Sequence, residues 1–426
     1  MNTLHAAQAA KKASIAAGVL NAAQKNKILL ACAAALLRRS PEILAANKID
    51  MELAEKTKIA APLIKRLLFN NEKLTESVQG IRALAVLPDP VGKVLSVTEL
   101  DLGLTLEKVS CPIGVIGVIF ESRPDALIQI ASLCLKSGNA VLLKGGAEAR
   151  EPHKCLAGII QDITVREGMP MGWCTLLENR EEAVQMLSLH EYIDMIIPRG
   201  SNEFVRYIMN NTKIPVLGHA DGICHVYFDD SAETEMSVSI ARDSKCQYTA
   251  VCNAAETFLV HEKAAKRVLP PIARALSCTE MVIRGCSRVR GIINAEEASE
   301  QDWRTEYLDS IISIKIVHSL EEAVSHINTY GSGHTDSIVS ADADNARQFM
   351  REVRSANVFW NCSTRFSDGY RYGLGAEVGV STSKLHARGP VGLEGLTIYK
   401  WLLSGSGHIV ADYVSGAKKF IHKKIL

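Results

Sequence analysis

The chain lacks three features that would place it in common classes of protein. No apolar run approaches the ~20 residues that a membrane-spanning helix needs, so we expect no such helix. The formal net charge of +1 gives no electrostatic reason for binding nucleic acid or an anionic membrane. The eleven cysteines include no Cys-x-x-Cys pair and no signal peptide opens the sequence, so we expect reduced thiols and a cytoplasmic location.

The length and composition indicate a soluble globular protein of two or three domains. Hydrophobic residues make up 47% and charged residues 22% of the 426 residues, and this length exceeds that of one ordinary core. The first ~85 residues are rich in strong helix formers, and Ser40-Pro41-Glu42 is a good helix start. Residues 93–109 alternate loosely between apolar and polar, which is typical of a β-hairpin.

From residue 113 onward, short apolar runs alternate with amphipathic stretches. Such runs are typical of parallel strands covered by helices on both faces, with ligands bound at the carboxyl ends of the strands. The runs that we assign to the first sheet are 114–120, 140–144, 174–177, 195–198 and 223–228. A second strand–helix unit follows over residues 257–360, and the Gly-rich, aperiodic segment 369–395 is typical of a functional loop. The predicted fold class is therefore α/β with two parallel sheets.

Cys252 is the candidate nucleophile. A polar, turn-prone stretch runs into it, and the β-rich run 257–260 follows. A cysteine at the mouth of a strand is held rigidly while its sulfur faces a cleft, which suits a reactive thiolate. The alternative is a buried structural thiol, because free cysteines are among the most buried residues.

The sequence has no Gly-x-Gly-x-x-Gly motif, so it carries no dinucleotide-binding fingerprint. Two strand-to-helix corners could still hold a cofactor phosphate through backbone N–H groups. One corner contains Arg199, Gly200 and Ser201, and the other contains Lys144 followed by two glycines. The simpler interpretation of each is an ordinary corner, with Lys144 as a surface charge.

No metal site is expected from His219, Cys224, His225 and His386, because their spacing matches no zinc-binding pattern. Cys224 and His225 lie in one apolar strand, where alternation points their side chains to opposite faces.

Several segments together resemble one family closely, the γ-glutamyl phosphate reductases or glutamate-5-semialdehyde dehydrogenases of the aldehyde dehydrogenase superfamily. The segments follow the family's order along nearly the whole chain, and the last of them is highly specific. They are residues 114–124, 133–140, 194–200, 251–257, 330–336 and 363–396.

The resemblance implies an aldehyde-dehydrogenase-like fold of three parts. An NADP-binding domain is expected from residues 1–92 and 110–240, and a catalytic domain from residues 241–393. A small β-flap for oligomerisation is expected from residues 93–109 and 394–426.

The resemblance also implies the site residues, motif by motif. Cys252 aligns with the family nucleophile. The implied cofactor-binding residues are Lys144, Arg199, Gly200, Ser201 and, from a short window, Glu306. The implied substrate-binding residues are Arg123, Asn361, Ser363, Thr364, Arg365 and His386.

Three positions depart from the family pattern. Asp125 stands where Asn is common, which could disturb oxyanion stabilisation. Ala147 stands where we expect Lys, which could weaken a preference for NADPH, and Thr249 replaces a usual Pro.

The implied reaction is the NADPH-dependent reduction of L-glutamyl 5-phosphate to L-glutamate 5-semialdehyde through a Cys252 thioester, the second step of proline biosynthesis from glutamate. Arg123 and Arg365 would bind the anionic groups, or else form structural ion pairs. Val216 stands where hydrolytic relatives carry a water-activating Glu, so we expect phosphate to be the partner in the reverse direction. The resemblance also implies a homo-oligomer and leaves open an association with glutamate 5-kinase.

Two other interpretations remain open from the sequence. One is a thiol hydrolase or acyltransferase in which His219 or His386 acts as base for Cys252, with no need for a nicotinamide. The other is a degenerate family member that serves as a binding or scaffolding module, although the intact Cys252 and the loop from Gly373 to Gly395 argue against decay.

Overall fold

Helices form the first part of the chain, as the sequence predicts. The structure is a computed structural model that describes residues 2–59, 61–219, 221–277 and 280–426. Three helices begin at an asparagine (Asn2, Asn21 or Asn70) whose side chain accepts a hydrogen bond from a backbone N–H in the first turn. The helices are α1 (Thr3–Ala17), α2 (Ala22–Arg38), α3 (Ser40–Lys56), α4 (Ala61–Leu67) and α5 (Asn71–Val86).

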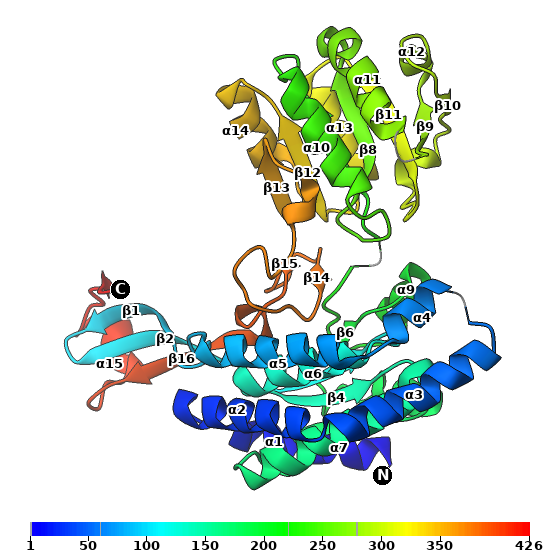
Figure 1. The fold of residues 1–426 in the computed structure, drawn as a ribbon. Coiled ribbons are helices and arrows are strands. Elements are labelled where there is room, and N and C mark those ends of the chain that lie inside the picture. The colour runs from blue at the N-terminus through cyan, green and yellow to red at the C-terminus, as the bar shows by residue number, and fades with distance from the viewer. Residues whose placement is uncertain (1, 60, 220, 278–279) are drawn as a thin grey trace.

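A four-stranded parallel sheet, in the order β5-β4-β3-β6, lies against these helices in the lower lobe of Figure 1. Every residue of β3 and β4 is buried, because helices cover both faces of the sheet. Its strands are β3 (Val115–Ile119), β4 (Ala140–Lys144), β5 (Cys174–Leu176) and β6 (Met195–Pro198). The helices between and after them are α6 (Pro124–Lys136), α7 (Arg150–Arg166), α8 (Arg180–Met186) and α9 (Asn202–Asn210).

A seven-stranded parallel sheet, in the order β10-β9-β11-β8-β7-β12-β13, forms the upper lobe (Figure 1). Phe228 and Phe258, from neighbouring strands, pack edge to face in its core. Its strands are β7 (Cys224–Phe228), β8 (Ala255–His261), β9 (Val282–Gly285), β10 (Glu296–Glu297), β11 (Ile311–Val317), β12 (Thr335–Val339) and β13 (Asn357–Trp360). Its helices are α10 (Thr234–Cys246), α11 (Glu262–Ser277), α12 (Ser287–Arg290), α13 (Leu320–Tyr330) and α14 (Ala343–Glu352).

The placement of β7 differs from the sequence prediction, which put residues 223–228 in the first sheet and ended that domain at residue 240. β7 pairs with β8 and β12 of the upper lobe, so the chain changes lobes before Cys224. An apolar run indicates a buried parallel strand but not which of two parallel sheets it joins. The cofactor and catalytic roles of the two lobes remain predictions.

A separate antiparallel sheet projects from the lower lobe as an arm (Figure 1). The predicted hairpin over residues 93–109 and the predicted C-terminal strand both form. They are β1 (Val94–Asp101), β2 (Leu104–Pro112) and β16 (Thr397–Ser404). With β17 (Lys423–Lys424) they form a sheet in the order β16-β2-β1-β17, and α15 (Val410–Val414) lies between β16 and β17 in the chain. The oligomerisation role of this arm remains a prediction.

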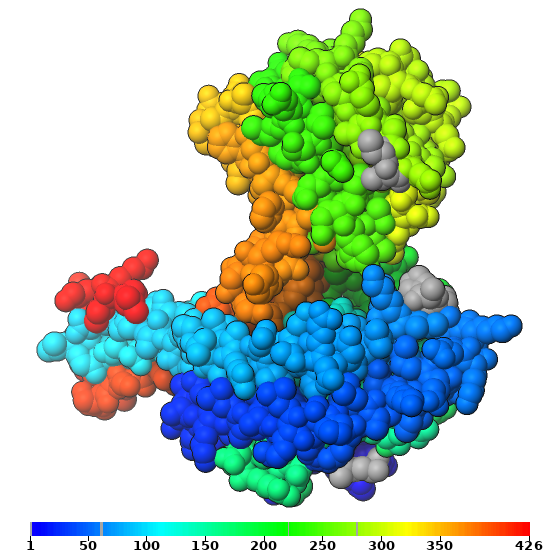
Figure 2. All heavy atoms as spheres, viewed as in Figure 1, coloured from blue at the N-terminus to red at the C-terminus, as the bar shows by residue number. Residues whose placement is uncertain are grey.

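The Gly-rich segment joins the two lobes at a narrow waist, seen in orange in Figure 2. It contains the short pair β14 (Val380–Ser381) and β15 (Gly389–Pro390). Four 3₁₀ helices complete the fold: η1 (Ala147–Ala149), η2 (Asp302–Arg304), η3 (Thr364–Phe366) and η4 (Glu394–Leu396). Among the described residues, no helix has both the length and the hydropathy to cross a bilayer.

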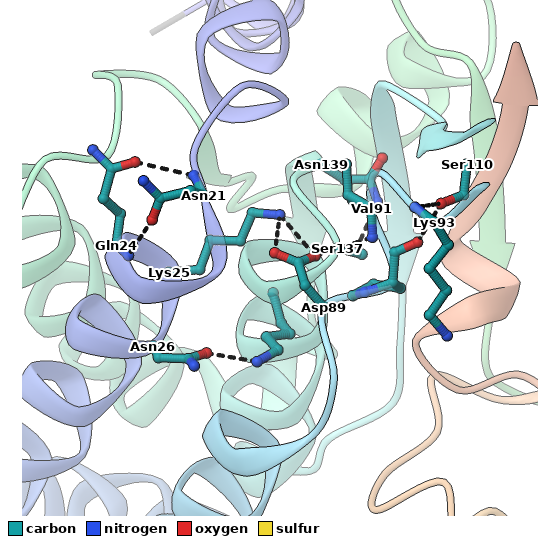
Figure 3. Close-up of polar contacts among 12 residues, drawn as sticks. Asn21, Gln24, Lys25, Asn26, Asp89, Val91, Lys93, Ser110, Ser137 and Asn139 are labelled. Atoms are coloured by element: carbon teal, nitrogen blue, oxygen red, sulfur yellow. Dashed lines mark hydrogen bonds and ion pairs between the residues drawn. The ribbon is translucent and has the colours of Figure 1, made fainter. Parts of the chain in front are cut away.

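Buried polar contacts fix the segment that leads from α5 into the arm (Figure 3). The Lys25 side chain is fully buried, and its Nζ lies 3.0 Å from the Asp89 carboxylate. Ser110 Oγ, on β2, accepts from Lys93 N at 2.8 Å and donates to Pro90 O at 2.7 Å. The base of the arm is therefore tied to α2 of the lower lobe.

Candidate active site

Cys252 lies in the loop between α10 and β8, where the sequence predicts a nucleophile. Its side chain is half-buried and lines a cavity of about 830 Å³ between the two lobes. The thiol of Cys224, on β7, donates to the Cys252 carbonyl oxygen over 3.2 Å. This hydrogen bond ties the Cys252 loop to β7 beside the cavity.

Two imidazoles flank Cys252. Ligand-capable atoms of His219, Cys252 and His334 all lie within 4.8 Å of one another. The two rings meet edge to face at a centroid distance of 4.8 Å. His219 Nδ1 lies 2.7 Å from the Val380 carbonyl oxygen, which can only accept, so Nδ1 carries the proton. The sequence considered His219 only as a base or metal ligand and did not single out His334.

The same cavity is lined by five arginines and five carboxylates: Arg66, Arg123, Arg199, Arg206 and Arg365, and Glu121, Glu203, Glu306, Asp368 and Glu377. Burial lowers the pKa of Arg199, and the neighbouring Arg123 lowers it further, while Glu377 raises it. Burial raises the pKa of Glu377 to about 7, against the opposing effect of Arg199. Arg66, Arg123 and Arg206 are paired with carboxylates, whereas Arg199 and Arg365 offer guanidinium groups that can bind an anionic group of a substrate.

Arg365 reaches the cavity from η3. Its Nε donates to Gln247 Oε1 at 2.9 Å, which orients the guanidinium plane. Arg371 Nη1 donates to the Arg365 carbonyl oxygen at 2.7 Å and adds a second positive charge nearby. Burial lowers the pKa of Arg365, and Arg371 lowers it further.

A second cavity, of about 700 Å³, adjoins the first. Both are lined by Phe120, Glu121, Arg199, Gly200, Ser201 and Glu203. Lys144 lines the second cavity at the end of β4, and its Nζ donates to Gly145 O at 2.5 Å. Burial lowers the pKa of Lys144. The two predicted cofactor corners therefore meet in one continuous groove.

Two glycines, Gly145 and Gly146, line the second cavity. A β-carbon at Gly146 would lie 2.9 Å from Ser122 N and from Glu148 Oε2. Gly146 therefore packs against Ser122 and Glu148 too closely for a side chain. The role of this corner in cofactor binding remains a prediction.

Glu306 lines the first cavity, as the resemblance implies for the acid that holds a ribose. Its Oε2 accepts from Asn202 Nδ2 at 2.5 Å, in the first turn of α9. Burial raises the pKa of Glu306, while the hydrogen bond from Asn202 lowers it. Asn202 is a residue that the sequence interpretation did not assign.

Four predicted substrate residues do not line either cavity. Asn361 bonds the backbone of Ser340 through both its amide atoms, and Ser363 Oγ caps η3. Thr364 is fully buried. His386 is exposed and lies 3.1 Å from Gly395 O. Their roles in substrate binding stay predictions, and the first two positions have a visible structural use.

Of the histidines and cysteine from which we expected no metal site, His219 and Cys224 both lie next to His334, whereas His225 and His386 have other neighbours. His225 Nδ1 lies 2.8 Å from Asp336 Oδ1, and both side chains are fully buried. His386 is on the surface.

Asp125, one of the departures from the family pattern, accepts a hydrogen bond from Arg123 Nη2 at 2.6 Å.

Comparison with known sequences gives matches along the whole chain. The profile described as "Aldehyde dehydrogenase family" matches residues 2–282 and 292–400. A γ-glutamyl phosphate reductase of Pelotomaculum thermopropionicum is 57% identical over 425 residues, which cover 100% of this chain and 98% of that protein. One of Acetivibrio thermocellus is 57% identical over 97% of this chain and 96% of its own length.

A solved structure is also similar throughout. The crystal structure of γ-glutamyl phosphate reductase from Thermotoga maritima superposes with a TM-score of 0.94 at 38% identity. The alignment covers 96% of this chain and 100% of that one.

Proposed function

This chain belongs to the aldehyde dehydrogenase family and, within it, to the γ-glutamyl phosphate reductases, and from that premise we propose that Cys252 carries its chemistry. The protein is an oxidoreductase that uses a nicotinamide cofactor to reduce L-glutamyl 5-phosphate to L-glutamate 5-semialdehyde in proline biosynthesis. The observation that carries our assignment is the position of Cys252, in a cavity that Arg199 and Arg365 also line and that shares lining residues with the second cavity.

The proposed reaction begins with attack of the Cys252 thiolate on the acyl phosphate carbonyl carbon. The C–O bond to phosphate breaks, phosphate leaves, and a thioester forms on the sulfur. A nicotinamide cofactor, when bound, would supply the hydride that reduces this thioester. The resulting thiohemiacetal gives up the Cys252 sulfur as thiolate and releases the aldehyde. Backbone N–H groups of the Cys252 loop stabilise the developing oxyanion, a contribution of ~3 kcal/mol per donor.

The arginines bind and orient the substrate in this proposal. Guanidinium groups match phosphate and carboxylate bidentately, and the substrate carries both. Arg365, fixed by Gln247, is suited to a bidentate contact of this kind. Arg199 is placed where the two cavities meet, so it contacts both the substrate and the cofactor end of the groove.

The absence of a water-activating carboxylate at Val216 favours phosphate over water as the acceptor in reverse. We expect semialdehyde oxidation with NADP⁺ to require added phosphate. The test is NADP⁺ reduction with and without phosphate, in the wild type and in Cys252→Ala, with Cys286→Ala as the control thiol. Equal rates without phosphate, or turnover in Cys252→Ala, would overturn the assignment.

We further propose NADPH as the preferred cofactor. Lys144 and Arg180 line the second cavity and offer positive charge to a 2′-phosphate. Glu148 lines it too, but its carboxylate accepts a hydrogen bond from Ser122 Oγ. Lys144→Met should raise the KM for NADPH more than that for NADH. An equal effect on both cofactors would argue against a 2′-phosphate contact at Lys144.

The arm is the proposed site of homo-oligomerisation. β16 is an edge strand, and its Trp401 and Leu403 side chains are 54% and 59% exposed. Exposed apolar edge strands of this kind pair with another chain unless something covers them. Light scattering should show an oligomer that Trp401→Glu dissociates.

The acyl phosphate is labile, which makes glutamate 5-kinase a second candidate partner. Co-purification of the two proteins tests this association.

A further inference from the structure

His219 and His334 face the nucleophile, and the proposed hydride chemistry leaves them without a role. His334 is fully buried at the start of β12, and its Nε2 has no hydrogen-bond partner among the described residues. A buried polar atom without a partner costs free energy, so it calls for an explanation.

In both imidazole rings, Nδ1 lies against polar groups of the protein. The Nδ1–H of His219 donates to Val380 O over 2.7 Å. His334 Nδ1 lies 2.8 Å from Thr335 Oγ1 and 3.6 Å from Cys224 Sγ, whose own S–H donates to the Cys252 carbonyl. Imidazoles that bind metals are held in this way, with one nitrogen bonded to the protein and the opposite lone pair left for the ion.

The distances among the ligand atoms of His219, Cys252 and His334 suit a small metal ion that binds both nitrogen and sulfur. Three atoms within 4.8 Å of one another have a common centre no more than about 2.8 Å from each, which is 4.8 Å divided by √3. Zinc binds nitrogen at about 2.0–2.1 Å and thiolate sulfur at about 2.3 Å. Inward shifts of less than about 1 Å would therefore complete three protein ligands, with water or solvent in the fourth position.

We propose that Zn²⁺ binds His219, Cys252 and His334 and blocks the nucleophile. The ion takes the thiolate as a ligand, and a thiolate so bound cannot attack an acyl phosphate until the ion leaves. Blocking of turnover rests on the proposed role of Cys252, whereas the metal site itself does not. Failure of one can therefore be told apart from failure of the other.

Binding is tested without an activity assay, in phosphate-free buffer because phosphate precipitates zinc. Co²⁺ is added to the full-length protein as a spectroscopic probe. We expect a thiolate-to-cobalt charge-transfer band at one ion per chain, which Zn²⁺ displaces and Cys252→Ala abolishes. We also expect Zn²⁺ to protect Cys252 from iodoacetamide, measured by peptide mass spectrometry with the other cysteines as internal references.

The imidazole variants decide whether the site is built as described. His334→Gln and His219→Gln should each raise the Zn²⁺ concentration that half-protects Cys252. The rise should be at least about 10- to 100-fold, which is the loss of affinity when a partner of a metal ligand is removed. His190→Gln is the matched control, because this exposed ring lies near Ser188 O and lines neither cavity. His219 is only half-buried, so His219→Gln is informative even if His334→Gln misfolds.

Two results would overturn the proposal. One is the absence of a thiolate–cobalt band in the wild type. The other is equal zinc protection of Cys252 in the wild type and in a folded His219→Gln protein, which would show that the thiol binds the ion without the imidazoles.

Discussion

Gly222 lies directly against the backbone of Cys252. A β-carbon at Gly222 would be 2.5 Å from the Cys252 Cα and 2.7 Å from its carbonyl carbon. No side chain fits there unless the nucleophile's loop moves, so this glycine sets the position of the sulfur from outside the loop.

Gly222→Ala should therefore lower kcat while leaving the fold intact. A misplacement of about 1 Å at a reacting group costs on the order of 100-fold in rate. Steady-state kinetics and thermal unfolding should be measured together, with Gly80→Ala as the control because its added methyl meets nothing within 4 Å. Wild-type kcat in a folded Gly222→Ala protein would show that the loop position does not limit the chemistry.

Arg365→Lys should raise the KM for the acyl phosphate more than it lowers kcat. Lysine cannot reproduce the planar fork, and hydrogen bonds to charged groups contribute about 1.5–3 kcal/mol, or roughly 10- to 100-fold. Arg347→Lys is the control, because Arg347 is an exposed residue paired with Asp344 on α14. An unchanged KM in Arg365→Lys would remove Arg365 from the substrate-binding set.

The buried pair of Lys25 and Asp89 should matter for stability rather than for turnover. Asp89→Asn leaves the fully buried Lys25 ammonium without its counter-charge, which costs about 3–5 kcal/mol when a buried pair is broken. Urea unfolding should show this loss, and the surface pair of Arg39 and Glu42 supplies the control Glu42→Gln, for which we expect no measurable change. A small effect of Asp89→Asn would mean that water reaches Lys25.

His153 should make the protein less stable in acid. Burial, together with the nearby charge of Lys144, lowers its pKa to about 4 in the folded state. The unfolded chain binds the proton near pH 6.5, so stability is complete above that pH and falls as the pH drops toward 4. At about pH 5 the loss should be about 2 kcal/mol relative to neutral pH.

Urea midpoints at about pH 7.5 and about pH 5 measure this loss. His153→Gln removes the titrating group, so its midpoint should change less between the two pH values. If the variant keeps the full wild-type dependence, other groups cause the acid sensitivity.

The local parts of the site were predictable from sequence, because they depend on short stretches of chain. Cys252 precedes a strand, and Lys144 and Arg199 end strands of one parallel sheet, so topology alone brings these two corners to the same edge. Burial and pairing across the fold were not predictable. Glu377 owes its raised pKa to burial, opposed by a residue 178 positions away, and β7 joined the other sheet because its apolar run fits either one.

Asn361 and Ser363 show the opposite limit. Their segment matches the family, yet their side chains bond the backbone of neighbouring turns. A family motif mixes residues that touch the ligand with residues that shape the loop around it, and only coordinates separate the two.

Polar contacts bind both ends of the arm to the lower lobe. Before β1, Asp89 pairs with Lys25, and before β16, Leu396 O accepts a hydrogen bond from Asn139 Nδ2 at 2.8 Å. Neither of these two contacts involves a residue of the upper lobe. Both contacts would therefore stay intact if the upper lobe changed its position relative to the lower lobe.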